Sequence, residues 1–268
     1  MVITMDTSMY SIIGLIEEGS WAIGSDGLLH TFAAGLPWLA FAFFLYLIVR
    51  AGMRLDRYRA LSVLNEARQE DIHKAVIAAE RRTVGEIIPV VLERSDEHPQ
   101  ANWLASLITV LLGSVLLVPW LPWGSPFALI ASQLALGALG FLLTCVLPGC
   151  KRCFVSDERA AAVAGEQAIQ EFYGLGLHRT EAQTGVLLFV SLFEHRVIVL
   201  GDEGIDAKVT PELWKTVEEA ILRGVKEGDL SHGLVEGIGL CADVLEEHFP
   251  WTEGDRNELP DRVIVRAE

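Results

Sequence analysis

The sequence predicts an α/β fold, with helices packed on the faces of a small central sheet, together with three transmembrane helices. The membrane part is predicted by a mean hydropathy of +0.36 and 51% hydrophobic residues, both high for a soluble protein. In addition, residues 98–150 contain no Asp, Glu, Lys or Arg. The sheet is predicted because segments with helical spacing alternate with short apolar runs rich in β-branched residues.

The first predicted transmembrane helix covers residues 31–49, TFAAGLPWLAFAFFLYLIV. About 20 apolar residues cross a hydrocarbon core of roughly 30 Å as a helix, so this run is long enough. The alternative is a cleaved signal peptide. No positive residue precedes the run and no small-residue cleavage site follows it, so an uncleaved span is favoured.

Two further spans form a predicted transmembrane hairpin, at residues 103–119 and 127–147. The turn PWLPWGSP (119–126) joins them, and its prolines stop each helix. Trp120 and Trp123 are expected at headgroup level, where an amphipathic indole is most stable. A soluble core helix is the alternative, but it would show a polar stripe, and neither run has one.

Positive residues indicate the orientation. Residues 1–49 contain no Lys or Arg, whereas residues 50–102 contain nine, and Lys151 and Arg152 follow the third span. The positive-inside rule therefore places the N-terminus outside and the α/β domain in the cytoplasm of a bacterial-type inner or plasma membrane.

The water-facing part has a clear predicted order of elements. Its predicted segments are a helix at 60–82, a strand at 85–93, a helix at 156–176, strands at 185–192 and 196–201, and helices at 210–228 and 230–249. Pro89 lacks an N–H group for a ladder, so its strand is expected at a sheet edge or with a bulge.

This order divides the chain into four parts. Residues 1–50 are an extracytoplasmic segment with the first span, 51–98 a juxtamembrane helix and the first part of the domain, 99–150 the inserted hairpin, and 151–268 the remainder. Because the sheet needs both pieces, the domain is expected to fold only when both halves are present.

Four blocks of the sequence resemble the TPM domain family. They are residues 79–92, 180–205, 213–238 and 248–261, which occur in the family order and span roughly 68–262 without the hairpin. The resemblance implies a compact α/β sandwich with a central sheet. It also implies three candidate roles, which are acid phosphatase activity, divalent-metal binding and assembly of membrane complexes. The inserted hairpin and the cytoplasmic location depart from better-known members.

Acidic residues follow the predicted strands on loops, and the resemblance points to the same positions. It maps family acids to Glu86, Asp202 and Glu258, with Asn257 beside the last and Asp255 on the same loop. Oxygen ligands of this kind suit Ca²⁺ or Mg²⁺. We therefore expect Glu86, Asp202, Asp255 and Glu258 as metal ligands. The alternative is that Asp202 forms a turn, Asn257 caps one and the others are solvated.

Other chemistries find little support in the sequence. Acids outnumber Lys and Arg by 36 to 21, which excludes a basic nucleic-acid footprint. Cys150 and Cys153 form a lone C-x-x-C near Cys145, with no second pair for a zinc site, so reduced thiols are expected. His195 is expected in a turn and His248 at a helix end, and neither has a visible catalytic partner.

The predicted function is a non-enzymatic binding or assembly module that lies against the bilayer and binds another membrane protein or complex. The alternative is a metal-dependent acid phosphatase acting on a membrane-proximal phosphate ester. Residues 148–268 carry 12 basic and 23 acidic residues, a balance of −11 that repels an anionic substrate unless a cation intervenes. Transport is a weaker third reading, because the spans carry no ionisable residue.

Overall fold

A computed structural model of the chain describes residues 46, 60–117, 126–253 and 258–266. The chain separates into two compact units, residues 1–50 and 51–268, and the second holds all described elements. The first predicted span lies outside the described residues, apart from Tyr46, which is helical.

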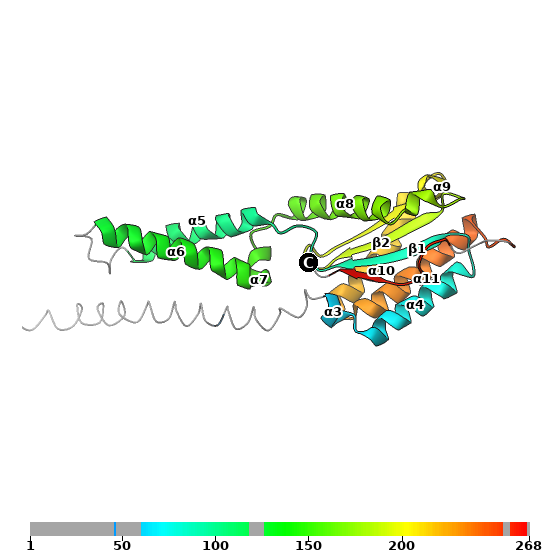
Figure 1. The fold of residues 1–268 in the computed structure, drawn as a ribbon, viewed down its shortest axis with the longest axis horizontal. Helices are drawn as coiled ribbons and strands as arrows, with labels where there is room; N and C mark the ends of the chain where they lie inside the picture. The colour runs from blue at the N-terminus through cyan, green and yellow to red at the C-terminus, as the bar shows by residue number, and fades with distance from the viewer. Residues whose placement is uncertain (1–45, 47–59, 118–125, 254–257, 267–268) are drawn as a thin grey trace, which may run out of the picture. The chain divides into compact units, whose positions relative to one another are not determined.

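Helices and strands alternate along the second unit (Figure 1). In chain order they are α3 (Ala60–Val63), α4 (Glu66–Glu80), β1 (Glu86–Leu92), α5 (Pro99–Leu117), α6 (Pro126–Val146), α7 (Pro148–Arg152), α8 (Asp157–Gly174), η2 (Leu177–Arg179), β2 (Gly185–Ser191), β3 (Arg196–Gly201), α9 (Glu203–Asp206), α10 (Pro211–Glu227), α11 (Leu230–His248) and β4 (Ile264–Arg266).

The four strands form one mixed sheet in the order β3-β2-β1-β4. β1 runs parallel to both β2 and β4, while β3 runs antiparallel to β2. The predicted α/β fold with a small central sheet is therefore confirmed. β1 comes from before the hairpin and pairs with strands from after it, so the sheet is built from both pieces of the chain.

The expectation that Pro89 places β1 at a sheet edge is wrong, because β1 lies between β2 and β4. The N–H of Glu86 donates to Thr184 on the β2 side, and the N–H of Ile87 donates to the Glu80 carboxylate on the other side. The backbone N–H groups of successive strand residues point to alternate sides of the strand. The N–H that Pro89 lacks would therefore point to the same side as that of Ile87, away from β2. Pairing with β4 starts only at Val90, so proline occupies a position just before that ladder begins.

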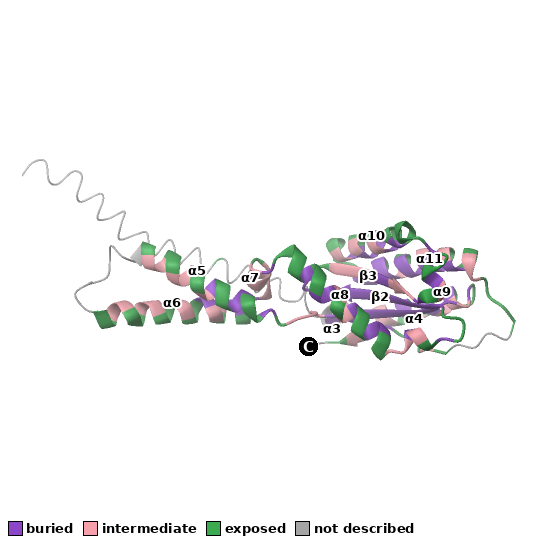
Figure 2. Ribbon diagram, turned by 90° about the horizontal axis from the view of Figure 1, so that it is seen from above, coloured by how far each residue is buried: buried purple, intermediate pink, exposed green. Residues whose placement is uncertain are grey.

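Helices cover both faces of the sheet (Figure 1). On one face, Ala164, Ala168 and Phe172 of α8 pack against apolar residues of β1 and β2. On the other face, α4, α10 and α11 bury a larger apolar cluster. All seven residues of β1 and of β2 are buried, as expected for strands covered on both faces (Figure 2).

Local signals set the ends of the helices. Ser156 accepts a hydrogen bond from the Arg159 N–H at the start of α8, and Gly228 ends α10 in the left-handed conformation. The single helix predicted at 60–82 is instead two helices. Asn65 separates α3 from α4, because its side chain accepts the Arg68 N–H and caps a new helix.

Helices α5 and α6 pack against each other as a hairpin with an apolar surface. Large exposed side chains recur along both, including Trp103, Leu112 and Val115 of α5 and Phe127 and Leu134 of α6. Figure 2 shows exposed positions spread along the whole hairpin. Among the helices in the described part of the chain, α6 alone is long and apolar enough to cross a membrane by length and composition. Three transmembrane helices are thus not supported, and the predicted turn lies mostly outside the described residues.

Candidate functional site

The described acids predicted as metal ligands lie at one end of the sheet, where β1 and β2 begin and β3 ends. Glu86 is the first residue of β1 and pairs with Gly185, the first residue of β2. Asp202 directly follows β3, and its N–H donates to the Gly185 carbonyl at 2.9 Å. Glu86 and Asp202 therefore flank β2 from opposite sides. We call this end of the sheet the acidic end.

Two of the predicted ligands are direct neighbours at the acidic end. The Glu86 Oε1 accepts a hydrogen bond from the Glu258 N–H at 3.0 Å, although the two residues are far apart in the chain. The Glu258 carboxylate, however, accepts the Glu181 N–H at 3.1 Å. The contact thus joins the Glu86 side chain to the Glu258 backbone, while the Glu258 side chain binds a neighbouring loop.

Asp202 has a structural role as well as an acidic side chain. Its Oδ1 accepts the Glu203 N–H at 2.9 Å and so caps the short helix α9. The carboxylate is almost fully buried. The pKa of the nearby Asp206 carboxyl is raised, first by burial and then by the charge of Asp202. The prediction that Asp202 forms a turn is therefore compatible with the structure.

A small pocket of about 210 Å³ lies beside Glu86, and it contains two acids that were not among the predicted ligands. Glu80 from the end of α4 and Asp261 from the loop before β4 line it, next to the half-exposed ring of Trp251. The pKa of Glu80 is raised to about 8, first because burial disfavours its charge and then because Asp261 and Glu86 repel it.

These acids do not form an assembled metal centre. Within residues 60–117, 126–253 and 258–266, no group of three or more His, Cys, Asp or Glu side chains is arranged to hold a metal ion. The structure brings Glu86 next to Glu258 and places Asp202 on the far side of β2. Asp255 and Asn257 lie outside the described residues.

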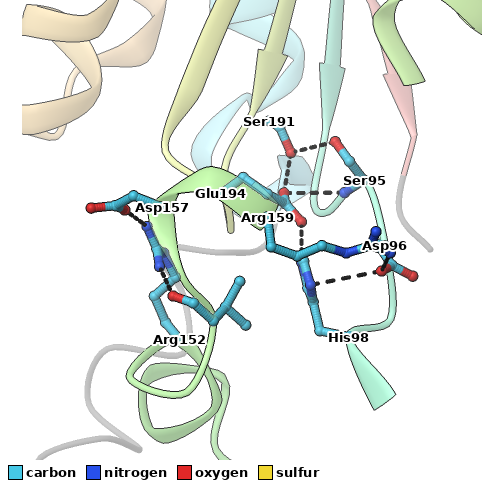
Figure 3. Close-up of polar contacts among 9 residues, drawn as sticks. Ser95, Asp96, His98, Arg152, Asp157, Arg159, Ser191 and Glu194 are labelled. Carbon is cyan, nitrogen blue, oxygen red and sulfur yellow. Dashed lines mark hydrogen bonds and ion pairs between the residues drawn. The ribbon is translucent and has the colours of Figure 1, made fainter. Parts of the chain in front are cut away.

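A buried polar cluster lies at the opposite end of the sheet, where β1 and β2 end (Figure 3). We call it the junction cluster. Its members are Ser95, Asp96, His98, Ser191 and Glu194.

Glu194 is the centre of the junction cluster and is completely buried. Its Oε1 contacts His98 Nε2 at 2.7 Å, and its Oε2 accepts the Ser95 N–H at 3.1 Å. The Ser191 hydroxyl also donates to Oε2, and the Ser95 hydroxyl donates to Ser191 at 2.9 Å. The Ser191 hydroxyl is thus buried and committed to Glu194, which makes it unsuitable as a nucleophile for a substrate.

His98 connects this cluster to the hairpin. It is 2% exposed, it directly precedes Pro99 at the start of α5, and it adopts a left-handed backbone with φ 48°. Its Nδ1 lies 3.7 Å from Asp96, which in turn pairs with Arg159 of α8 at 3.0 Å. The segment that leads from β1 into α5 is therefore held by both the sheet and α8.

Sequence reasoning missed the junction cluster. His98 marked only the start of the uncharged run, and its partner Glu194 lies 96 residues away, beyond the hairpin. The positions of two other histidines were predicted correctly. His195 lies in the turn between β2 and β3, and His248 is the last residue of α11.

The cysteines give the structure no cross-link. Cys145, Cys150, Cys153 and Cys241 are all free thiols in the structure. Cys241 is fully buried in α11, and burial raises the pKa of its thiol far above the usual range.

The fold and the site define the class of this protein as an α/β domain interrupted by an apolar helical hairpin. Residues 156–244 match the family model described as the TPM domain, so this part of the chain is assigned as a TPM domain. The match contains the blocks at 180–205 and 213–238, whereas the blocks at 79–92 and 248–261 lie outside it.

One solved structure is similar to this chain. It is the NMR structure of the BA42 protein from the psychrophilic bacterium Bizionia argentinensis, with 21% sequence identity and a TM-score of 0.49. The similarity covers 76% of this chain and 95% of that one. No curated protein matches the sequence.

Proposed function

We propose that this TPM-domain protein is an integral membrane protein whose cytoplasmic α/β domain is a binding or assembly module for another membrane protein. The observation that carries the proposal is the α5–α6 hairpin. It is free of charged residues, and large apolar side chains are exposed along it, with Phe127 83% exposed. A water-exposed hairpin of this composition would be unfavourable, whereas lipid would cover it.

The position of the hairpin supports a role close to the bilayer. At its base, the Asn102 side chain in α5 contacts the Cys145 sulfur in α6 at 3.6 Å, so the chain leaves the domain and returns at one place. Lys151 and Arg152 follow immediately in α7. These cations, and those in residues 50–102, favour the cytoplasmic side.

The membrane proposal is tested by extraction and by protease access. Carbonate washing of membranes from cells that express the chain should leave it in the pellet. In inside-out vesicles, protease should cut the α/β domain, while in intact spheroplasts the domain should stay protected. Release by carbonate, or cleavage in spheroplasts, would contradict the topology.

A site-specific photo-crosslinker tests the assembly role. Placed at the exposed Ile169 on α8, it should give one discrete adduct in intact membranes. The same group at the exposed Lys74 on α4 is the matched control and should give none. Adducts of equal yield at both positions would indicate nonspecific proximity and contradict a defined partner surface.

Cation binding at the acidic end is a further part of the proposal. Burial, and then the charges of Asp261 and Glu86, raise the pKa of Glu80, and Ca²⁺ or Mg²⁺ would relieve the repulsion that these two acids exert on it. A cation at a hundred times its Kd would stabilise the folded chain by about 2.7 kcal/mol. Thermal unfolding with Ca²⁺, Mg²⁺ and no cation tests this, with Glu86→Gln expected to abolish the shift.

The alternative function, a metal-dependent phosphatase, has a direct assay. Phosphate release from a generic phosphomonoester is measured with and without Ca²⁺ and Mg²⁺, beside an Asp202→Ala variant. Turnover that requires metal and disappears in the variant would favour the enzyme. Equal background in both would favour the binding module.

A further inference from the structure

A cleft of about 420 Å³ opens at the end of the domain from which α5 leaves, on the side of the sheet covered by α10 and α11. Five aliphatic side chains from three helices and one turn form its walls. They are Val63, Leu192, Leu222, Val225 and Leu230.

The walls of the cleft continue the main apolar core. Leu192 and Leu230 are almost fully buried members of that core, and Val63 and Val225 pack against it. A volume of this size falls within the range of about 300–1,000 Å³ that is typical of small-molecule sites, which are mostly apolar with a few polar groups. The cleft therefore suits a ligand with a substantial apolar part.

The rim of the cleft adds a small number of polar groups. His195 and Lys226 lie there together with one acid, Glu227. Next to Val63, the guanidinium of Arg68 donates to the Val63 carbonyl at 2.6 Å, which adds a second cation near the wall. Partial burial, and then repulsion by Arg152, lower the pKa of His195, which disfavours a charged ring there.

The location of the cleft limits the source of a ligand. His195 directly follows Glu194, which contacts His98 at the start of the hairpin, so cleft and hairpin meet at the same end of the sheet. If the hairpin crosses the bilayer as proposed, the cleft faces the inner leaflet. An amphiphile can then move from the leaflet into the cleft without crossing bulk water.

We propose that this cleft binds a long-chain fatty acid, with its hydrocarbon chain between α10 and the β2–β3 turn and its carboxylate at Lys226. This inference rests on the proposed membrane attachment. The apolar walls bury the chain, and removal of its CH₂ groups from water favours binding. The carboxylate meets the exposed Lys226 cation at the rim, so its charge stays paired and partly hydrated.

Photolabelling in nanodiscs of phosphatidylcholine tests the proposal on the full chain, without detergent that would compete for the cleft. The probe is palmitate that carries a photoreactive diazirine, and labelled peptides are identified by mass spectrometry. Label is expected on the C-terminal half of α10. Unlabelled palmitate should suppress it, and methyl palmitate, which lacks the charge, should suppress it less.

Two matched pairs of variants on α10 sharpen the test. Leu222→Trp fills the cleft and should remove most of the label, while Leu213→Trp, at an exposed position outside the cleft, should keep it. Lys226→Gln should weaken competition by palmitate about threefold, as expected for an exposed ion pair, and Lys215→Gln should not. Tm values close to that of the parent chain show that each variant is folded.

The results separate this inference from the membrane proposal. Label confined to α5 and α6, or equal label in Leu222→Trp and Leu213→Trp, would overturn the fatty-acid site. A chain that carbonate strips from membranes, but that still takes up palmitate at α10, would overturn membrane attachment and leave the cleft assignment standing.

Discussion

Glu194 shows how the domain accommodates a fully buried carboxylate. Removing such a group from water is costly unless its oxygens are paired and hydrogen-bonded. Here the Ser95 N–H, the Ser191 hydroxyl and the His98 ring supply those partners. All three partners belong to segments that end or leave the sheet at one point. Because the buried Glu194 carboxylate needs these partners, the path of the chain into the hairpin is fixed.

His98→Ala should therefore be strongly destabilising. The variant leaves Glu194 buried with one partner fewer, and breaking a buried pair costs about 3–5 kcal/mol. We expect the Tm of the full chain to fall by about 10 °C, measured by circular dichroism. His232→Ala, at an exposed position of α11, is the matched control and should leave the Tm unchanged. A fall of equal size in both variants would show that the effect is not specific to the junction cluster.

Glu80 predicts a pH dependence of stability. Its pKa is about 8 in the folded chain and near 4.5 when the group is unperturbed, so the folded state favours the protonated form. The stability that this preference provides is fully present below pH 4.5 and is lost as the pH rises through 8. Glu80→Gln keeps an acceptor for the Ile87 N–H but cannot ionise.

The Glu80→Gln variant should therefore match the parent chain at pH 4 and exceed it at pH 8.5. After allowance for solvent screening of this partly exposed group, the gain at pH 8.5 is about 2 kcal/mol. Thermal unfolding at the two pH values measures it. Glu70→Gln, at an exposed position of the same helix, should show no such difference. If the difference in stability between the parent chain and Glu80→Gln is the same at both pH values, the raised pKa of Glu80 is contradicted.

Single residues at the two ends of the sheet differ in how far the sequence could predict them. Glu86 and Asp202 are adjacent to strand ends, so the strand pattern located them. Glu80 lies in a helix and Glu194 in a turn, and each has a partner distant in the chain, Asp261 for Glu80 and His98 for Glu194. Only the strand order brings those partners together, and one sequence does not determine that order.

At the scale of elements, α10 and α11 pack unusually closely at two glycines. A Cβ added at Gly224 would lie 2.6 Å from the Gly233 Cα and 2.8 Å from the Asp229 carbonyl oxygen. Both neighbours are backbone atoms, so the helices would have to separate. Gly224→Ala should lower the free energy of unfolding by about 1–3 kcal/mol, the typical cost of overpacking.

Gly165→Ala is a matched substitution that should have the opposite effect. Gly165 lies inside α8, and a Cβ added there would meet nothing within 4 Å. The substitution should raise the free energy of unfolding by about 0.5–1 kcal/mol, because alanine loses less backbone entropy in a helix. Thermal unfolding of the two variants, side by side, tests the packing of α10 on α11, since helix propensity alone predicts the same sign for both.

Element prediction succeeded where a segment was long and periodic. The residues of α8, α10, α11, β2 and β3 were predicted to within a few positions, because apolar spacing and capping residues agree there. β4 has three residues and α9 has four, too few to show a period. The division of α3 from α4 depends on one capping hydrogen bond of Asn65, which the apolar spacing concealed.

At the scale of the whole molecule, the hairpin interrupts a sheet that it does not help to build. β1 is an inner strand, but it is the one strand of the sheet encoded before the hairpin. A fragment of residues 155–268 would therefore lack the strand that joins β2 to β4. We expect this fragment to show no cooperative thermal transition, and a sharp transition with native-like circular dichroism would contradict that expectation.

Replacement of the hairpin is the complementary test. The contact between Asn102 and Cys145 brings its two ends together, so a short Gly/Ser linker in place of residues 103–145 can connect them without strain. The junction cluster lies entirely outside the replaced segment. We expect this chain, shortened further to begin at Ala60, to fold cooperatively in water, with a Tm that still falls when His98→Ala is introduced. Aggregation of this chain while the full chain folds in nanodiscs would instead show that the hairpin itself stabilises the domain.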